Sequence, residues 1–569
     1  MPRAETILFL QLPQLDNDVV GAHENVYLAA AHLTCAIEAS AEDAFFRPLV
    51  PTPDEDSLDD RHLLDFVCRL RPKLLACTLY LWNIERTLHL LAGVRRAMPS
   101  TRIVVGGPEV AYRHPFLFRS RAADAVVVGE GEHVLPFILR AMRHGKVTDF
   151  ASVAWRAGRS YIWGQRPAPE VNLAAALPPP GHRACRPDAS GMAYVETSRG
   201  CPMHCTYCRY HHLRRRSNAL DTAQTLARIA ALQRMGAREI RFVDPTFNAN
   251  PHFRQTLRAL AHMNRSRKLA FFAELRPDTI DAQEARWLEQ ANFREIECGV
   301  QSLDPDVLRA IRRHCRPAHA EAGIRRLLAH GIAVTVDLMY GLPGQTYADV
   351  QRSIAWALTL KGANVQCMQT LLLPGTDLRA QAGRWRIRAD PKPPYGVLST
   401  RTLPVSRMRR IEDDIASHPS LSSDTPTTRF VGRTLPGLFA ERIEFVVDGT
   451  RELAPIAGRT NRRAVLFRGS DIFGAREAIA AAIRRAAREN PHVLWQFVLV
   501  PRGEEPLDLL DYLVRELCAL DPMVLDRHGG AAVHGKRASR RLFILLPSAR
   551  RFDAAWRNAA EEVLGEAFF

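Results

Sequence analysis

Three closely spaced cysteines are the residues of this chain best suited to chemistry. The segment 197–210, TSRGCPMHCTYCRY, places Cys201, Cys205 and Cys208 in a Cys-x3-Cys-x2-Cys pattern directly after an apolar run typical of a β-strand. Soft thiolate ligands select an iron–sulfur cluster or zinc. Three cysteines on a four-iron cluster leave one iron open, as a catalytic cluster requires, whereas a structural zinc site is closed by four ligands.

Zinc is the alternative that the residues leave open, because His204, His211 or His212 would complete a four-ligand site. Zinc cysteines usually occur as two Cys-x2-Cys pairs, and this sequence contains no second pair. An odd number of scattered cysteines argues against a disulfide framework. We expect the remaining ones to be small buried apolar side chains: Cys35, Cys68, Cys77, Cys185, Cys298, Cys315, Cys367 and Cys518.

The bulk composition is that of a globular protein of several domains, with 47% hydrophobic and 24% charged residues among 569. The net charge is +16, but 61 acidic residues are spread among 77 basic ones, so nucleic-acid binding is not favoured. No apolar run reaches the roughly 18 residues of a membrane span. The segment 1–16 resembles a first strand more than a signal peptide, which predicts a cytoplasmic protein.

The region 1–150 alternates strand-like and helical patterns, with strands expected at 6–12, 45–50, 73–80, 102–107 and 125–130. This alternation predicts an α/β fold with a doubly wound, Rossmann-like parallel sheet. Such sheets bind ligands at the carboxyl ends of their strands, where glycines let backbone approach closely. The residues that we place at this edge are Tyr80, Trp82, Asn83, Gly106, Gly107, Pro108, Gly129, Glu130 and Gly131.

A second alternating series fills 193–400, after a region 151–192 that we interpret as a linker. Its strands are expected at 193–197, 239–244, 270–275, 294–300, 333–340 and 365–373, and six strand–helix repeats predict a (β/α)6 partial TIM barrel. Chemistry is then expected at the carboxyl ends of these strands. The remainder, 401–569, is expected to form an α+β unit that caps the barrel, on position alone.

The spacing Cys-x3-Cys-x-aromatic-Cys, with Tyr207 in the aromatic position, resembles the signature of the radical-SAM superfamily. Over about 5–415 the chain is similar to the branch with an N-terminal cobalamin-binding domain. That branch includes the anaerobic magnesium-protoporphyrin ester cyclase and cobalamin-dependent C-methyltransferases. The resemblance rests on the cysteines and on Trp82–Glu85, Gly106–Glu109, Gly129–Glu132, Phe242–Asp244, Gly299–Ser302 and Gly341–Gly344.

The resemblance implies a [4Fe–4S] cluster, S-adenosylmethionine (SAM) and cobalamin as cofactors. In such enzymes SAM chelates the open iron, and an electron from the cluster releases a 5′-deoxyadenosyl radical that abstracts hydrogen from carbon. By position, Asp244 would face the methionine ammonium, or simply cap a turn. Glu274 and Arg276 would lie near the ribose or carboxylate, or form a surface ion pair. Gln301 and Ser302 would end the next strand on the SAM side, and the turn Gly341–Gly344 would let backbone reach the adenine.

The usual cobalamin motif, Asp-x-His-x-x-Gly, is incomplete here. The chain has Asp18 between Asp16 and Gly21, where the cobalt-ligating histidine would stand, so the resemblance implies cobalamin without a lower histidine. His23 is expected to be a loop residue. Trp82 would cover the lower cobalt face or lie in the core. The basic run 209–216 is a solvated helix start or an anion-binding segment.

The leading hypothesis is methylation of an unactivated carbon, with one SAM as radical source and a second as methyl donor to cobalamin. Oxidative ring formation or rearrangement with the same cofactors is the alternative, and a zinc-stabilised nucleic-acid-binding protein is the alternative from another class. The expected partners are a small-molecule or peptide substrate and an external electron donor such as flavodoxin or ferredoxin. The sequence does not indicate which substrate is used.

Overall fold

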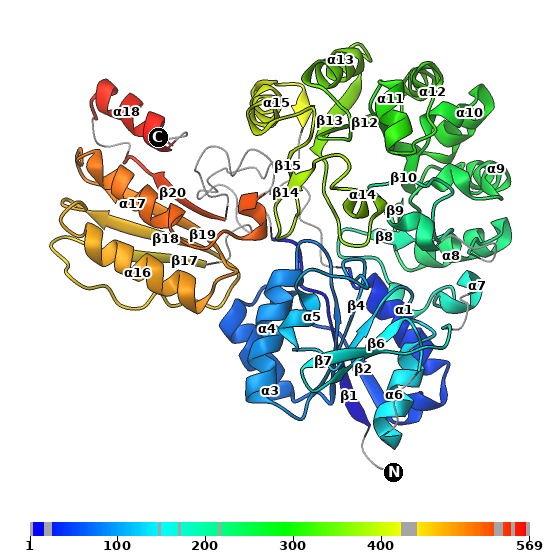
Figure 1. The fold of residues 1–569 in the computed structure, drawn as a ribbon, viewed down its shortest axis with the longest axis horizontal. Helices are drawn as coiled ribbons and strands as arrows, with labels where there is room; N and C mark the ends of the chain where they lie inside the picture. Colours follow the sequence, from blue (N-terminus) through cyan, green and yellow to red (C-terminus); the bar gives the residue numbers. More distant parts are fainter. Residues whose placement is uncertain are drawn as a thin grey trace.

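The computed structural model describes residues 4–15, 26–145, 149–168, 172–213, 218–422, 441–527, 539–547 and 552–564. These residues form three α/β units (Figure 1). In that view the N-terminal unit lies at the bottom, the second unit above it on the right, and the C-terminal unit on the left. No helix among the described residues is long and apolar enough to cross a bilayer.

The N-terminal unit has the expected doubly wound sheet. Strands β1 (Glu5–Leu10), β2 (Phe46–Leu49), β3 (Leu74–Thr78), β4 (Arg102–Gly106) and β5 (Ala125–Val127) run parallel in the order β2-β1-β3-β4-β5. Alternate side chains pack on opposite faces. Helices α3 (Asp60–Leu70) and α4 (Ile84–Ala97) cover one face, and α1 (Leu28–Glu38) and α6 (Leu135–His144) the other. Two short helices, α2 (Pro53–Asp56) and α5 (Leu117–Ser120), complete the unit.

The sheet continues into the region expected to be a linker. Strands β6 (Val153–Ala157) and β7 (Ser160–Trp163) form an antiparallel hairpin on β5, so the connecting segment begins later than residue 151. The hairpin escaped prediction because its outer strand is only half-covered, with Ile162 62% exposed. Among its described residues, the connection that follows contains the short helices α7 (Leu173–Ala176) and η2 (Arg183–Cys185).

All six strands expected in the second unit are present. They are β8 (Met192–Val195), β9 (Glu239–Phe242), β10 (Ala270–Leu275), β11 (Phe293–Gln301), β12 (Ala333–Tyr340) and β13 (Ala363–Gln369), parallel and in chain order. The intervening helices are α8 (Thr222–Arg234), α9 (Phe253–Met263), α10 (Ala282–Ala291), α11 (Pro305–Ala310), α12 (Pro317–Ala329) and α13 (Tyr347–Leu358).

This partial barrel extends past residue 400. After α14 (Asp377–Ala380), β14 (Arg388–Ala389) and β15 (Val397–Ser399), helix α15 (Val405–Ser417) packs on the barrel core through Met408, Ile411 and Ile415. The two-residue strand β16 (Leu421–Ser422) then pairs parallel with β13. Residues up to 422 therefore belong to this unit.

The C-terminal unit differs from the α+β arrangement that we expected. Strands β17 (Glu441–Val446), β18 (Arg462–Gly469), β19 (Leu494–Pro501) and β20 (Arg540–Ile544) pair entirely in parallel. Helices α16 (Arg476–Glu489) and α17 (Asp508–Cys518) connect successive strands, and α18 (Ala554–Leu564) follows. Parallel neighbours require a crossover of a dozen or more residues, which these helices provide.

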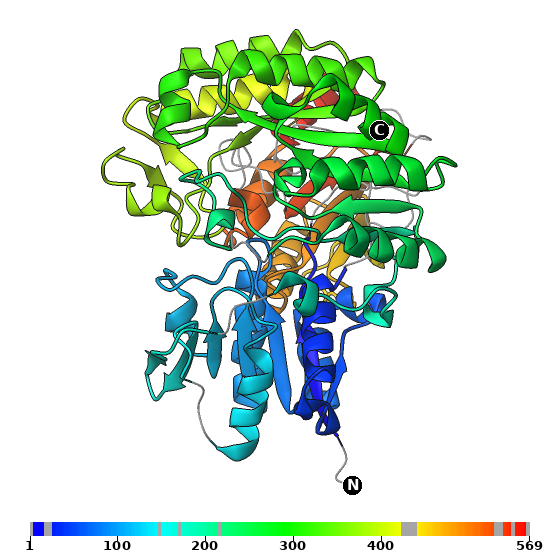
Figure 2. The same ribbon diagram turned by 90° about the vertical axis from the view of Figure 1, so that its right-hand side faces the viewer.

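The C-terminal unit is docked on the N-terminal unit through buried polar contacts. Arg463 on β18 forms an ion pair with Asp59, both 1% exposed, and Asn461 donates to the carbonyl of Asp56 at 3.0 Å. Arg527 pairs with Glu85 at the start of α4. Figures 1 and 2 show the C-terminal sheet beside both other units. The expected cap over the barrel is thus anchored on the helices of the first sheet.

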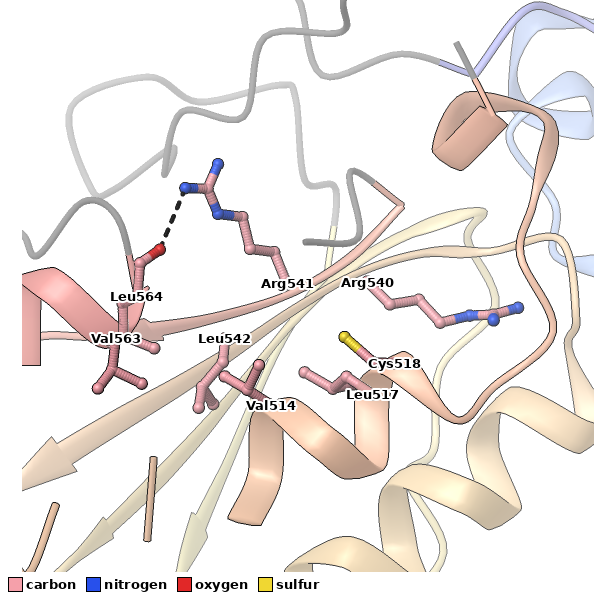
Figure 3. Close-up of a pocket in the computed structure, with 8 residues that line it drawn as sticks. All are labelled: Val514, Leu517, Cys518, Arg540, Arg541, Leu542, Val563 and Leu564. Atoms are coloured by element: carbon pink, nitrogen blue, oxygen red, sulfur yellow. Dashed lines mark hydrogen bonds between the residues drawn. The ribbon is translucent and has the colours of Figure 1, made fainter. Parts of the chain in front are cut away.

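One small cavity lies within the C-terminal unit (Figure 3). It has a volume of about 30 Å³ and is lined mainly by apolar side chains of α17, β20 and α18. Arg541, at its edge, donates to the carbonyl of Leu564 at 3.5 Å. Since about 10–15 Å³ of such volume holds one water molecule, the cavity has room for a few waters and is too small for an organic substrate.

A carboxylate buried under the partial barrel provides a test of this packing. Glu412 on α15 is 8% exposed and lies 3.4 Å from both the hydroxyl of Tyr340 and the side-chain nitrogen of Gln369. Burial raises its pKa from 4.5 to about 7. The native state therefore holds a proton that the unfolded chain loses, and stability falls as the pH rises between these values.

We expect Glu412→Gln to abolish this part of the pH dependence. A shift from 4.5 to about 7 corresponds to about 3 kcal/mol at most. Urea unfolding at pH 5 and pH 7 measures the difference. The exposed Glu489→Gln, at the end of α16, is the control, which should keep the wild-type slope, and an unchanged slope in Glu412→Gln would contradict the assignment.

Candidate active site

The cysteine segment begins in a buried network at the end of β8. The backbone N–H of Thr197 donates to Asp244 at 2.7 Å, and the hydroxyl of Ser198 donates to the same carboxyl at 3.1 Å. Asp244 follows β9 and is 0% exposed, and its burial raises its pKa to about 7. Its carboxyl oxygens are engaged by the start of the loop. Asp244 thus fixes where the cysteine loop leaves the sheet, and its predicted contact with the methionine ammonium remains a prediction.

The three thiols converge on the inner side of this loop. Cys201 and Cys205 are buried and Cys208 is half-buried, and the three pack together with Met203. The backbone N–H of Met203 lies 3.4 Å from the sulfur of Cys201, and that of Tyr210 lies 3.5 Å from the sulfur of Cys208. Hydrogen bonds to cluster sulfurs tune reduction potential, so the loop backbone supports an iron–sulfur site.

The spread of the three sulfur atoms favours a cluster over a single ion. The three sulfurs do not all lie within 4.8 Å of one another, although all three residues are described. A zinc ion with Zn–S bonds of about 2.3 Å would hold its sulfurs about 4 Å apart. The wider spacing fits a [4Fe–4S] cluster, whose irons are distributed over the three thiolates. Burial raises the pKa of Cys208 to about 11, so its thiol ionises only when metal binds.

Tyr207 and Arg313 contact the cysteine loop at Cys205. Tyr207 packs into the barrel core and interacts with Cys205. Arg313, between α11 and α12, directs one guanidinium nitrogen to within 3.8 Å of the Cys205 sulfur and donates another to the carbonyl of Gly299. Sequence reasoning missed Arg313, because it lies 108 residues from Cys205 and has no local motif.

The strand ends place the predicted SAM residues around the loop. Gln301 ends β11 with φ of 71°, is 8% exposed, and has a buried side-chain oxygen without a hydrogen-bond partner among the described residues. Such an orphaned acceptor fits a ligand that donates to it. Glu274 opens onto the barrel mouth, and the surrounding protein and the carboxylates Glu297 and Asp244 raise its pKa to about 7.

Three other predicted SAM residues have structural partners. Arg276 pairs with Asp278 at 2.7 Å instead of Glu274, and its guanidinium lies 3.0 Å from the sulfur of Met203 in the cysteine loop. The hydroxyl of Ser302 accepts from the N–H of Asp304 at 3.2 Å. Gly341 has φ of 84°, and a Cβ there would approach Met408 of α15 to 3.0 Å. Their predicted contacts with SAM remain predictions.

The predicted cobalamin residues lie at the facing edge of the N-terminal sheet. Tyr80 and Trp82 stack with ring centroids 4.5 Å apart. Gly129 has φ of 86°, and no heavy atom lies within 4 Å of where its Cβ would stand, so this strand end offers open space to a ligand. Asn83, in contrast, is 1% exposed and links the carbonyls of Leu12 and Thr78.

The turn after β4 is fixed by backbone contact. A Cβ at Gly107, where φ is 108°, would lie 2.6 Å from the carbonyl oxygen of Leu79, so glycine is needed there for packing. Gly106 ends the strand and Pro108 follows the turn. A Cβ at Gly131 would similarly lie 3.1 Å from the side chain of Leu33 on α1.

The residues of the incomplete cobalamin motif (16, 18, 21 and 23) and the arginines 214–216 lie outside the described residues.

The two sheet edges are joined directly. Arg199, two residues before Cys201, pairs with Glu130 at 2.8 Å and with Glu132 at 2.9 Å across the domain junction. It also pairs with Glu196 at 2.8 Å. Although burial opposes ionisation, His32 and Arg199 hold the pKa of Glu132 well below its ordinary value. This network places the carboxyl ends of both parallel sheets face to face.

The fold and this junction define a protein in which a Rossmann-like domain presents its ligand edge to a cluster-bearing partial barrel. Comparison with family models agrees: residues 195–357 match the radical SAM superfamily, and residues 48–139 match the B12 binding domain. The chain thus contains a radical SAM domain and, before it, a B12-binding domain. Its cofactors are a [4Fe–4S] cluster, SAM and cobalamin, and the sulfur spacing, the orphaned Gln301 oxygen and the open edge at Gly129 fit them.

Curated relatives share only part of the chain. The 2-(S-pantetheinyl)-carbapenam-3-carboxylate methyltransferase of Streptantibioticus cattleyicolor is 28% identical over 48% of this chain and 43% of its own. The tRNA-2-methylthio-N(6)-dimethylallyladenosine synthase of Frankia alni is 26% identical over 52% of this chain and 57% of its own. The chain therefore spans about half the length of the curated relatives it matches.

Among solved structures, the fold is similar to that of the radical SAM methyltransferase TsrM from Kitasatospora setae with cobalamin and a [4Fe–4S] cluster bound. The TM-score is 0.55 at 16% identity, over 68% of this chain and 77% of that one. A likeness at this level of identity is one of fold.

Removing the arginine at the junction should destabilise the protein. Arg199→Gln leaves three carboxylates facing one another in a largely buried site, and we expect it to lower the free energy of unfolding by about 3 kcal/mol or more. Urea unfolding of the cluster-reconstituted protein measures this. As a control, Arg267→Gln removes an exposed ion pair with Glu289 (2.7 Å) and should cost less than about 1 kcal/mol. Equal effects for the two variants would refute the role of Arg199.

Proposed function

We propose that this protein transfers a methyl group from SAM, by way of cobalamin, to an unactivated carbon of a small-molecule or peptide intermediate. When bound, the cluster and SAM supply a carbon-centred radical, and cobalamin supplies the methyl group. The observation that carries the proposal is the direct contact between the two cofactor edges. Arg209, the residue after Cys208, donates to the carbonyls of Pro108 and Val110 at 2.8 and 2.9 Å.

The chain's own residues have defined tasks in this proposal. Asp244 and Arg199 hold the cysteine loop against both sheets, and Arg209 fixes the distance between the loop and the turn after β4. Gln301 offers an acceptor to SAM at the end of β11. The stacked Tyr80 and Trp82 form one wall of the opposite edge. Substrate would enter between these edges, where protein on both sides excludes water.

Methyl transfer can be tested before the substrate is known, because loading cobalamin requires only SAM. We expect the anaerobic, cluster-reconstituted protein with reduced cobalamin and SAM to form S-adenosylhomocysteine. A Cys201→Ala/Cys205→Ala/Cys208→Ala variant is the control for radical chemistry and should form no 5′-deoxyadenosine. Formation of 5′-deoxyadenosine without S-adenosylhomocysteine would overturn methylation in favour of ring formation or rearrangement. Absence of both products would overturn the whole proposal.

The electron donor is proposed to be an acidic one-electron carrier such as flavodoxin or ferredoxin, docking beside the cluster loop. A recess of about 630 Å³ lies between the end of β10 and helices α11 and α12. Its cationic lining contains Arg276, Arg309, Arg312, Arg313 and Arg316. Because Arg313 also reaches the Cys205 sulfur, a carrier seated here lies next to the cluster. Complementary charge would guide its association.

Reversing one of these charges should slow electron delivery by the protein donor only. For the exposed Arg316→Glu we expect cluster reduction by flavodoxin to slow about tenfold at low salt, since charge steering acts on association rate. Reduction by dithionite should be unchanged. The matched control is Arg286→Glu, an exposed arginine on α10 outside the recess. An equal loss in both variants, or no loss in Arg316→Glu, would rule out docking at this recess.

A further inference from the structure

Three potential metal ligands, Cys35, Glu38 and His182, meet where helix α1 of the N-terminal unit contacts the connecting segment, and Cys185 lies beside them. Cys35 and Glu38 are three residues apart on α1, and His182 and Cys185 are three residues apart at η2. The pairs come from segments about 147 residues apart, and neither pair by itself resembles a metal motif. The sequence suggested only isolated buried cysteines here.

The side chains are close enough for one ion. The Cys35 sulfur lies 3.4 Å from Nδ1 of His182, and Nε2 of His182 lies 2.8 Å from the Glu38 carboxylate. One ligand atom from each of these three residues lies within 4.8 Å of the others, and among the described residues no other group of histidine, cysteine or acidic side chains meets that limit. Tetrahedral zinc, with bonds of about 2.0–2.3 Å, separates its ligand atoms by about 3.5 Å.

Charged groups lie around the thiols of Cys35 and Cys185, which are close enough to each other to interact electrostatically. Arg228 on α8 lies close to both, and Arg183 lies 3.6 Å from Glu38. Two thiolates, one carboxylate and a divalent ion leave one negative charge, which Arg228 offsets.

We propose that Cys35, Glu38 and His182 bind a structural zinc ion, with the neighbouring Cys185 turning in as the fourth ligand, and that this site fastens α1 to the segment entering the radical SAM barrel. Binding displaces the thiol protons of Cys35 and Cys185 to solvent, and Nδ1 of His182 exchanges its contact with the Ala184 N–H (3.3 Å) for the metal. Glu38 turns from Nε2 of His182 towards the ion. Zinc is preferred over magnesium or calcium because thiolate and imidazole are soft and borderline ligands.

The proposed site would act on the domain junction through α1. His32, one turn before Cys35 on that helix, lies 3.5 Å from Glu132, and Glu132 pairs with Arg199 beside the cysteine loop. A metal that fixes α1 would therefore hold Glu132 in place for Arg199. The site is separate from the cluster and does not depend on the reaction that the enzyme catalyses.

The test measures zinc and iron together in the full-length, cluster-reconstituted protein. We expect about one zinc per chain in addition to about four irons. Cys35→Ser and His182→Ala should reduce zinc at least tenfold while iron is retained. The control Cys68→Ser replaces a half-buried cysteine on α3 and should keep zinc. A Cys201→Ala/Cys205→Ala/Cys208→Ala variant should lose iron and keep zinc.

A second measurement guards against variants that fail to fold. Wild-type protein stripped with a chelator is titrated with Co²⁺ alone, and binding at thiolates should give intense visible absorption that Zn²⁺ displaces. The proposal is overturned if wild-type protein binds neither Zn²⁺ nor Co²⁺ outside the cluster cysteines. It is also overturned if zinc disappears with the cluster cysteines, or if mass spectrometry shows a Cys35–Cys185 disulfide in the freshly purified protein.

Discussion

The site depends on one requirement: the carboxyl ends of two parallel sheets must face each other. Parallel sheets expose their ligand-binding edge at the carboxyl ends of the strands, so two such edges can share a reaction space only when opposed. Arg199 meets this requirement by pairing with carboxylates from both sides. Because these groups are largely buried, each needs the other's charge, and the pairing selects one orientation of the domains.

Burial of ionisable side chains has a different consequence in each part of the molecule. Inside the barrel mouth it keeps carboxylates such as Glu274 and Asp244 close to neutral pKa values, so their charge responds to what is bound nearby. In the cysteine loop it holds thiols protonated until a metal compensates the charge. Between the C-terminal and N-terminal units, the buried pair of Arg463 and Asp59 holds the two units together. The C-terminal unit is fixed to the N-terminal helices and carries no strand-end motif that sequence could have revealed.

Sequence periodicity predicted most of the architecture, because parallel strands buried on both faces appear as apolar runs separated by helical patterns. Periodicity failed where a strand is not an apolar run clearly set apart from its surroundings. The β6–β7 hairpin has an exposed outer strand, and the parallel pairing of β17 to β20 leaves no local trace. Among site residues, the cysteines and Gln301 occupy the expected positions. The strand-end positions of Asn83, Gly107 and Ser302 predict ligand contacts, whereas the contacts that the structure describes for them are with backbone groups.

The sequence alone determined the chemistry of the cysteine loop, because ligand type and spacing within eight residues are local properties that folding does not rearrange. It also determined two successive α/β units, because periodicity is local too. Only the tertiary structure decided which distant residues meet: Arg313 with Cys205, Arg199 with Glu130 and Glu132, and Cys35 with His182. Such contacts join segments far apart in the chain, and their selection depends on burial and charge complementarity that no short stretch of sequence expresses.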